Sequence, residues 1–215
     1  MQIAVIADII GSRRLPDRDH AQRDLDDTIA GVHAHFPLAL DPLHPTVGDE
    51  QQATYPTLDA ALTSLLLLRL ALPEGIECRF GVGVGDLEVV RTAAGSIPEG
   101  PGWWAARDAI EIVHGLQKRT APSARTWVAA AAGHDAAMAQ TVRLANAYAL
   151  SRDHVVGAMS ARARRLTYGR CRGQTQADLA RAEGISQSAV SQALATAGAG
   201  SIIEGLAQLA REVRT

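Results

Sequence analysis

The stretch "LHPTVGDEQQATY" (residues 43–55) decides the fold, because it predicts two strands joined by a tight turn. Its flanks favour β-structure, whereas Gly48 and Asp49 are typical turn residues. Two interpretations of the turn remain open. It is either a plain hairpin turn, or it holds Asp49 at the tip as a metal-binding carboxylate, which requires a second carboxylate from elsewhere in the chain.

The patterns on both sides of this hairpin predict a sheet with helices. An apolar strand (residues 2–7) and a helix from about Asp19 to His35 precede it. It is followed by a buried helix from near Thr57 and by a second hairpin in "CRFGVGVGDLEVV" (residues 78–90), which turns at Gly85 and Asp86. After these come a helix from about Gly102 and a short strand in "RTWVAA" (residues 125–130). This order predicts an α+β, ferredoxin-like antiparallel sheet with strand 1 at its centre and helices on one side. The glycines of "GVGVGD" are interpreted as turn and bulge residues.

Composition limits the class of protein. The chain has 215 residues, of which 47% are hydrophobic and 20% charged, so it predicts one large or two modest globular domains. Cys78 and Cys171 lie far apart and show no metal-ligand spacing, which fits a reducing cytoplasm. The N-terminus lacks a basic start, and the most apolar window contains Arg69 and is shorter than the roughly 20 residues that a membrane helix needs. We therefore expect a cytoplasmic protein without membrane insertion.

The C-terminal part is basic, although the formal net charge of the chain is −2. Residues 151–215 contain nine arginines and five acidic residues, and "SARARRLTYGRCRGQ" (residues 160–174) concentrates five of those arginines. Such a cluster favours contact with a phosphate backbone, and a solvated basic helix is the alternative.

The segment after this cluster has helix-turn-helix spacing. In "QTQADLARAEGISQSAVSQALATAG" (residues 174–198), Ala180 is small where two helices cross, Gly184 permits a left-handed turn, and Ser186 can cap the second helix. An ordinary helical hairpin is the alternative. The candidate DNA-contacting residues are Arg170, Arg172, Gln174, Gln187, Ser188, Ser191 and Gln192. The segment also resembles those of bacterial regulators and the final region of sigma factors.

The first acidic position that could partner Asp49 is Asp8, at the end of strand 1. The predicted topology brings the two carboxylates close together. Unpaired carboxylates so placed repel each other unless a cation neutralises them, and oxygen ligands suit Mg²⁺ or Mn²⁺. The alternative is that both aspartates only begin loops and turns.

Four motifs carry a resemblance to known families. They are "DIIGS" (residues 8–12), "VGDE" (residues 47–50), "RFGVGVGDL" (residues 79–87) and "GPGWWAARDAI" (residues 100–110). In this order they resemble the motifs of class III nucleotidyl cyclases, so the N-terminal part is similar to a cyclase or GGDEF-like palm domain. Over nearly its full length the chain resembles the SatD family, a bacterial group with N-terminal "GDI" and "GDE" patterns and a C-terminal helix-turn-helix.

The cyclase resemblance implies roles for particular residues. It implies that Asp8, Asp49 and the backbone carbonyl of Ile9 bind the metal, and that Arg107 stabilises charge on a transferred phosphoryl group. Where cyclases have a ribose-orienting asparagine and a purine-reading lysine, this chain has Trp103 and Pro45. These departures put cyclase activity in doubt, since losing an oriented donor costs a factor of roughly 10² to 10³.

Further candidates for nucleotide binding are Gly11, Ser12, Arg13 and Trp103. Arg13 follows the first motif and either meets phosphates or lies in a solvated loop. Trp103 either stacks on a base or packs in the core.

Two functions follow as hypotheses. The first is a DNA-binding regulator with a nucleotide-sensing palm domain at residues 1–132 and a helical domain at residues 133–215, whose helix-turn-helix spans residues 174–197. The second is a metal-dependent nucleotidyl-transfer enzyme that the helical domain tethers or regulates. Palm domains of the cyclase type and helix-turn-helix proteins both commonly act as twofold dimers, so these two resemblances imply a homodimer.

Overall fold

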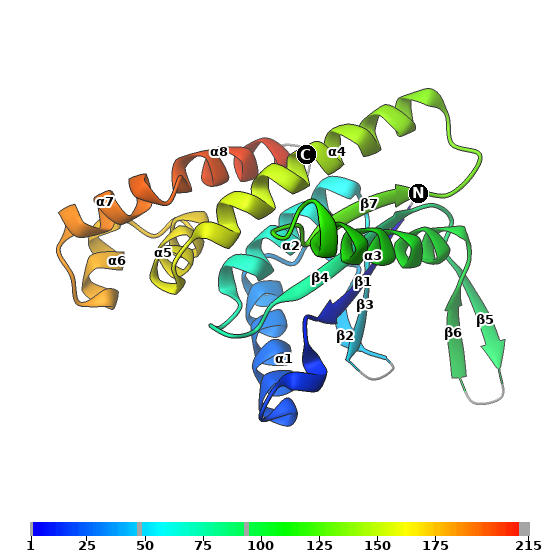
Figure 1. Ribbon diagram of the computed structural model, residues 1–215, viewed down its shortest axis with the longest axis horizontal. Coiled ribbons are helices and arrows are strands. Elements are labelled where there is room, and N and C mark those ends of the chain that lie inside the picture. The colour runs from blue at the N-terminus through cyan, green and yellow to red at the C-terminus, as the bar shows by residue number, and fades with distance from the viewer. Residues whose placement is uncertain (1, 47–48, 93–94, 211–215) are drawn as a thin grey trace.

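The computed structural model describes residues 2–46, 49–92 and 95–210, and has the α+β class predicted from the sequence (Figure 1). Its strands are β1 (Ile3–Ile9), β2 (Asp41–Pro45), β3 (Glu50–Tyr55), β4 (Cys78–Val84), β5 (Glu88–Thr92), β6 (Gly95–Glu99) and β7 (Thr126–Ala130). Its helices are α1 (Arg18–His35), α2 (Leu58–Ala71), α3 (Pro101–Arg119), α4 (Ala136–Ala158), α5 (Ala161–Cys171), α6 (Gln176–Glu183), α7 (Gln187–Thr196) and α8 (Ala199–Leu209), with a 3-10 turn η1 (Ser12–Arg14). The predicted hairpin tip at residues 47–48 lies outside the described residues.

The main sheet has the strand order β2-β3-β1-β4-β7. The central strand β1 pairs antiparallel with both β3 and β4, as the ferredoxin-like pattern predicts, and β7 is added parallel to β4. The register places Asp8 of β1 between Glu50 of β3 and Arg79 of β4. Three charged residues therefore lie side by side across the end of β1.

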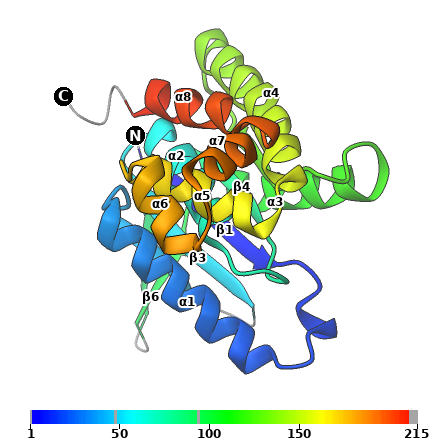
Figure 2. The ribbon, with the colours of Figure 1, turned by 90° about the vertical axis from the view of Figure 1, so that its left-hand side faces the viewer.

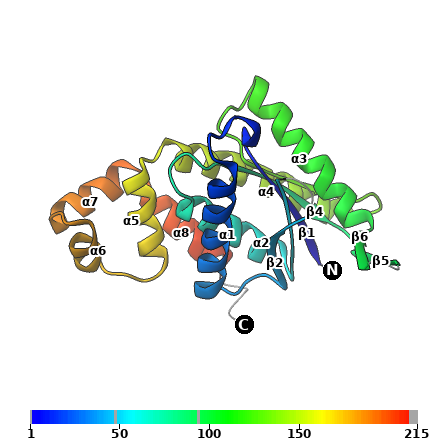
Figure 3. The same ribbon diagram turned by 90° about the horizontal axis from the view of Figure 1, so that it is seen from below.

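Helices cover both faces of this sheet (Figure 3). Alternate residues of β1 point to opposite faces, so Ile3 and Val5 pack with α1 and α2, while Ala4 and Ile6 pack with α3. The prediction of helices on one side is thus wrong. It holds for α1 and α2 of the ferredoxin-like unit, and α3 belongs to the extension that continues from β4 to β7.

The glycines of β4 explain how α3 lies against the sheet. A Cβ atom at Gly81 would come within 2.2 Å of the Ala106 carbonyl oxygen, and one at Gly83 within 2.0 Å of the Gly102 carbonyl oxygen. Only glycine permits this approach of backbone to backbone. The interpretation of "GVGVGD" as turn and bulge glycines is therefore wrong for Gly81 and Gly83, which form a close helix-to-strand contact within β4, whereas Gly85 lies in the bend after that strand.

The β5–β6 hairpin is separate from the main sheet and projects from the body of the molecule (Figure 1). The sequence predicts instead that the strand after Gly85 and Asp86 folds back on the strand before them. That prediction is wrong, because β5 pairs with β6, in a register that joins Glu88 to Glu99.

Helix α4 is attached to the sheet by buried polar contacts. The side-chain amide of Asn146 donates to the Val128 carbonyl at 2.9 Å, and its oxygen accepts from the Val128 N–H at 2.7 Å. Asp153 accepts from the backbone N–H groups of Arg125 and Thr126 at 2.6 and 2.8 Å. Helix α4 therefore packs directly on β7, and the domain boundary at residues 132–133 stays a prediction.

Helices α5 to α8 gather at one end of the molecule, beside α1 and α2 (Figure 2). A small core of Leu166, Leu179, Ala180, Val190 and Leu194 holds α5, α6 and α7 together. Ile202 and Leu206 of α8 belong to the main core, which also contains Ile3 and Val5 of β1. Among the described residues, no helix combines the length and apolar character that crossing a membrane requires.

Candidate functional site

A pocket of about 530 Å³ opens at the end of β1. The residues that line it are Asp8, Ile9, Gly11, Ser12, Arg14, Asp49, Arg79 and His114. Asp8 and Asp49 lie 41 positions apart in sequence, and both line this pocket. Their roles, and those of Ile9, Gly11 and Ser12, stay predictions.

Local structure explains how these residues meet. Asp8 is opposite Glu50 in the β1–β3 register, and Asp49 immediately precedes Glu50. After β1 the chain turns sharply at Gly11, whose φ of 72° lies in the left-handed region that glycine adopts without strain. The turn brings Ser12 and η1 back beside Asp8.

Both aspartates of the pocket already have arginine partners. Asp8 Oδ1 accepts from Arg79 Nε at 2.8 Å, and Asp49 Oδ1 lies 3.8 Å from a guanidinium nitrogen of Arg18. The prediction of two unpaired carboxylates is therefore wrong. The cause is register, because Arg79 is the residue of β4 directly opposite Asp8. The sequence contains Arg79 in a quoted motif, but its pairing depends on the strand alignment.

The residues of this pocket fit a metal ion only if a bound ligand supplies part of its coordination. Within the described part of the chain, no group of three or more His, Cys, Asp and Glu side chains could hold a metal ion. A metal held by protein ligands alone therefore does not fit. Mg²⁺, however, is usually bound by one or two carboxylates together with the phosphates of a ligand, and two carboxylates line this pocket.

Arg107 lies outside the pocket lining and is paired with Glu50. Its two terminal nitrogens donate to the two carboxylate oxygens of Glu50, one of them at 2.7 Å. This hydrogen-bonded pair raises the pKa of Arg107, although the side chain remains 48% exposed. A transferred phosphoryl group would have to compete with Glu50 for this guanidinium.

The remaining nucleotide-binding candidates are Trp103 and Arg13. Trp103 packs against the cluster of Ala4 and Ile6 beneath α3, which matches the core interpretation of this residue. The side chain of Arg13 lies outside the described part of the chain, whereas Arg14 lines the pocket.

His114 also lines the pocket and was missed by the sequence interpretation. Partial burial lowers its pKa, and the charges of Arg79 and Lys118 lower it further. Its signal in the sequence is helical spacing, since His114 follows Arg107 by two turns of α3.

The second candidate site is the pair α6 and α7. Thr175 and Asp178 form a capping box at the start of α6, Gly184 ends it with a φ of 65°, and the Ser186 hydroxyl accepts from the Ala189 N–H at 3.2 Å to begin α7. The predicted turn and cap are confirmed. The side chains of Gln187, Ser188, Ser191 and Gln192 are exposed, as predicted.

Most arginines of residues 160–174 are engaged within the protein. Arg165 pairs with Glu183 at 2.8 Å, Arg162 lies 3.6 Å from the same carboxylate, and Arg164 lies 3.7 Å from Glu77. The guanidinium of Arg170 donates to the Gln174 carbonyl, and Arg172 lies over the Tyr168 ring at 6.0 Å. The basic surface available to a phosphate backbone is therefore smaller than the sequence indicates.

Fold and site together define an α+β protein with a ferredoxin-like sheet, a polar pocket at the end of its central strand and a helical C-terminal part. The chain belongs to the SatD family, whose family model matches residues 2–151. A comparison with curated proteins finds no match.

Three solved structures similar to this chain are nucleotidyl cyclases. A bacterial light-regulated adenylyl cyclase is 13% identical over 59% of this chain and 74% of that one, with a TM-score of 0.43. Adenylate cyclases from Trypanosoma brucei are 17% identical over 49% of this chain and 67% of that one, with a TM-score of 0.39. The guanylate cyclase domain of RhGC from Catenaria anguillulae is 14% identical over 51% of this chain and 71% of that one, with a TM-score of 0.40. At these identities the similarity concerns the fold and not the chemistry.

Proposed function

We propose that the protein is a DNA-binding regulator whose sheet domain binds a phosphate-bearing ligand. The observation that carries the proposal is the capped pair α6 and α7, with four short polar side chains exposed on α7. Amide and hydroxyl groups of this size can reach base edges when a helix enters the major groove. DNA is the proposed partner of this surface.

DNA binding is tested with the full chain, because Ile202 and Leu206 of α8 are part of the main core and removing the helices would expose it. Fluorescence anisotropy with a mixed-sequence duplex should show affinity that falls as salt rises. Gln192→Glu adds a negative charge to α7 and should weaken binding at least tenfold. Gln140→Glu makes the same change on an exposed position of α4 and should leave the affinity unchanged. Equal affinity for the two variants would refute the proposal for α7.

The proposed ligand of the sheet domain is a nucleoside triphosphate with Mg²⁺ or Mn²⁺. The pocket offers the carboxylates of Asp8 and Asp49 to the metal and the basic side chain of Arg14 to the phosphates, whereas Arg79 would first have to leave Asp8. The ion would bridge ligand phosphates to the carboxylates. No base-specific contact is assigned, since Pro45 and Trp103 stand where cyclases read the purine and orient the ribose.

Thermal melting tests this ligand. Mn²⁺ with a triphosphate at about 100 times its dissociation constant should stabilise the fold by roughly 2.7 kcal/mol, which raises the melting temperature by several degrees. Asp49→Asn should abolish the shift. Asp41→Asn, at an exposed position of β2, should preserve it. If Asp49→Asn and wild type shift equally, the ligand binds elsewhere or not at all.

Nucleotidyl transfer is the second candidate, and the convergence of Asp8 and Asp49 in one pocket favours it. Against it, Arg107 is held by Glu50. Pyrophosphate release from a triphosphate in the presence of Mn²⁺ measures this activity directly. We expect none from the wild-type protein, and sustained release that Asp8→Asn abolishes would make the enzyme the better assignment.

A homodimer is the proposed assembly, since DNA half-sites repeat about one helical turn apart and suit a twofold protein. Light scattering at tens of micromolar measures the mass. A strict monomer there would contradict this proposal and leave the two ligand sites unaffected.

A further inference from the structure

A second pocket, of about 380 Å³, lies between the sheet domain and the C-terminal helices. Its lining comes from the end of α1 and the loop after it, from α2, from α5 and from α8: His35, Phe36, Pro37, Leu38, Thr63, Arg170, Cys171, Ile203, Leu206, Ala207 and Ala210. This volume is within the range of pockets that hold small organic molecules. The pocket is separate from the one at the end of β1 and shares no residue with it.

The wall of this pocket is largely apolar. Phe36, Ile203 and Leu206 supply hydrocarbon surface. Cys171 adds to it, because burial raises the pKa of its thiol to about 12 and keeps it protonated. The interior therefore suits a hydrocarbon body rather than a sugar or a phosphate.

Thr63 interrupts this apolar wall. Its side chain is only 3% exposed, and its hydroxyl has no hydrogen-bond partner among the described residues. A buried polar group without a partner costs free energy, so most such groups in proteins are paired. The hydroxyl oxygen exposes less than 1 Å², so a ligand oxygen would reach it once the side chains next to it shift slightly.

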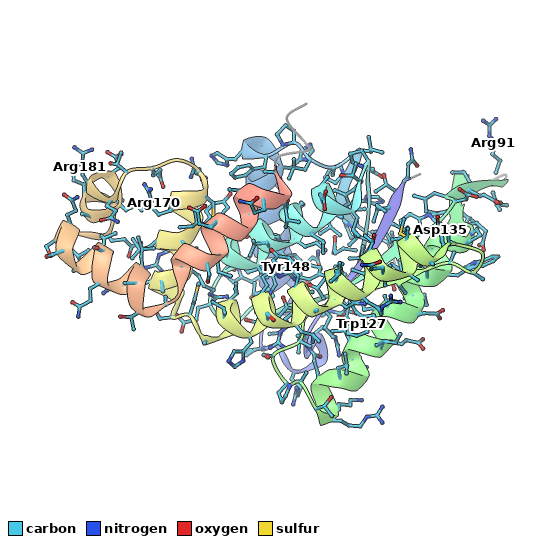
Figure 4. All side chains as sticks on the ribbon, turned by 90° about the horizontal axis from the view of Figure 1, so that it is seen from above. Arg91, Trp127, Asp135, Tyr148, Arg170 and Arg181 are labelled. Carbon is cyan, nitrogen blue, oxygen red and sulfur yellow. The ribbon has the colours of Figure 1, made fainter. Side chains whose placement is uncertain are left out.

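Arg170 supplies positive charge to the same pocket. Unlike Arg162, Arg164 and Arg165, it forms no ion pair with any carboxylate of the described residues. Within the described part of the chain its hydrogen bond goes to the backbone carbonyl of Gln174, and a guanidinium has five N–H donors. Donors thus remain for an anionic group, and their planar arrangement matches a carboxylate. Figure 4 shows Arg170 on α5, well away from Arg91 of the hairpin at the other end of the molecule.

We propose that this pocket binds a small carboxylic acid with an apolar body, whose carboxylate is bound by Arg170 and the Thr63 hydroxyl and whose body packs on Phe36, Ile203 and Leu206. The site does not depend on the proposed function. Its position is informative, however, because α5 and α8 both contact α7. An acid bound here would contact α1 and α2 on one side, and on the other side α5 and α8, the helices on which α7 packs.

Isothermal titration calorimetry with octanoate and the full chain tests the proposal. We expect octanoate to bind the wild-type protein and octanamide, which has the same body without the charge, to bind at least tenfold more weakly. Arg170→Gln should weaken octanoate binding at least tenfold. Arg172→Gln removes a neighbouring exposed arginine outside the pocket and should bind octanoate like wild type. Absence of octanoate binding, or equal affinity for Arg170→Gln and Arg172→Gln, would overturn the proposal.

Two further variants protect the test against misfolding. Thr63→Val removes the unpaired hydroxyl at nearly constant shape, so it should raise the melting temperature without ligand and yet weaken octanoate binding several-fold. Ala207→Trp places a large side chain at an exposed position of the lining and should block the pocket. Wild-type affinity in Ala207→Trp would refute the site, and wild-type affinity in Thr63→Val would refute the role of its hydroxyl.

Discussion

Arg69 of α2 and Asp153 of α4 lie 84 positions apart in the sequence and form an ion pair of 2.6 Å, with side chains 3% and 0% exposed. Asp153 also accepts from Arg152 at 2.7 Å and from two backbone N–H groups at the start of β7. One carboxylate thus pairs with two buried arginines. It also joins α2, α4 and the sheet.

Replacing this carboxylate should destabilise the fold strongly. Asp153→Asn keeps the shape of the side chain but leaves Arg69 and Arg152 buried without a counter-charge. Breaking a buried pair in this way typically costs about 3–5 kcal/mol. Urea denaturation should show that loss in the free energy of unfolding.

Asp41→Asn is the matched control for Asp153→Asn, since Asp41 forms an exposed pair with His44 at 3.6 Å. We expect a change within about 0.5 kcal/mol. A similar loss for both variants would mean that the buried network does not carry the stability assigned to it.

Replacing glycine by alanine should change the stability in opposite directions at two positions, one in β4 and one in α1. Gly83→Ala places a methyl group against the backbone of α3 and should cost about 3 kcal/mol, as overpacking of a rigid contact does. Gly31→Ala lies in α1 with nothing within 4 Å of the added methyl and should stabilise by about 0.5–1 kcal/mol. Thermal melting of both variants measures the two signs. Destabilisation by Gly31→Ala, or tolerance of Gly83→Ala, contradicts the packing described.

Removing the charge of Glu50 should release Arg107. In Glu50→Gln the guanidinium loses its carboxylate partner at the edge of the pocket, so we expect triphosphate affinity to rise about tenfold, equivalent to about 1.4 kcal/mol. The double variant Glu50→Gln with Arg107→Gln should lose this gain. Titration calorimetry in the presence of Mn²⁺ measures both, and an equal gain in the double variant would exclude Arg107 as its source.

The pair of Glu183 and Arg165 predicts a dependence on pH. The hydrogen bond from Arg165 lowers the pKa of Glu183 from its ordinary value of 4.5. A depressed carboxyl pKa stabilises the folded state above that ordinary value, and the contribution disappears as the pH falls through the folded pKa. Wild type should therefore melt higher than Glu183→Gln at pH 7, and the difference should vanish on acidification below about pH 4.5. Glu204→Gln, at an exposed position of α8, should melt like wild type at pH 7.

The sequence predicts the local features of this protein better than the contacts between its elements. Caps and turns such as Ser186 and Gly184 depend on neighbouring residues, so their signals are present in one short segment. The central position of β1 also follows from the order of elements. By contrast, the pairing of Arg79 with Asp8 requires the strand register, and the use of Gly81 and Gly83 requires knowledge of what lies above them.

The candidate site shows the same division. The order of motifs brings Asp8 and Asp49 together, but residue type alone does not show that arginines already balance their charge. Arg69 and Asp153 had no motif to mark them, because a buried ion pair between distant segments leaves no local pattern.

The alternation of side chains along β4 also bears on where the pocket at the end of β1 opens. Gly81 and Gly83 let α3 lie flush on the strand, and Arg79 is the residue on the same face that restores a side chain, beneath Gln117 and beside His114. The opening beside Asp8 therefore lies where the glycines of β4 end and an arginine side chain takes their place on the same face.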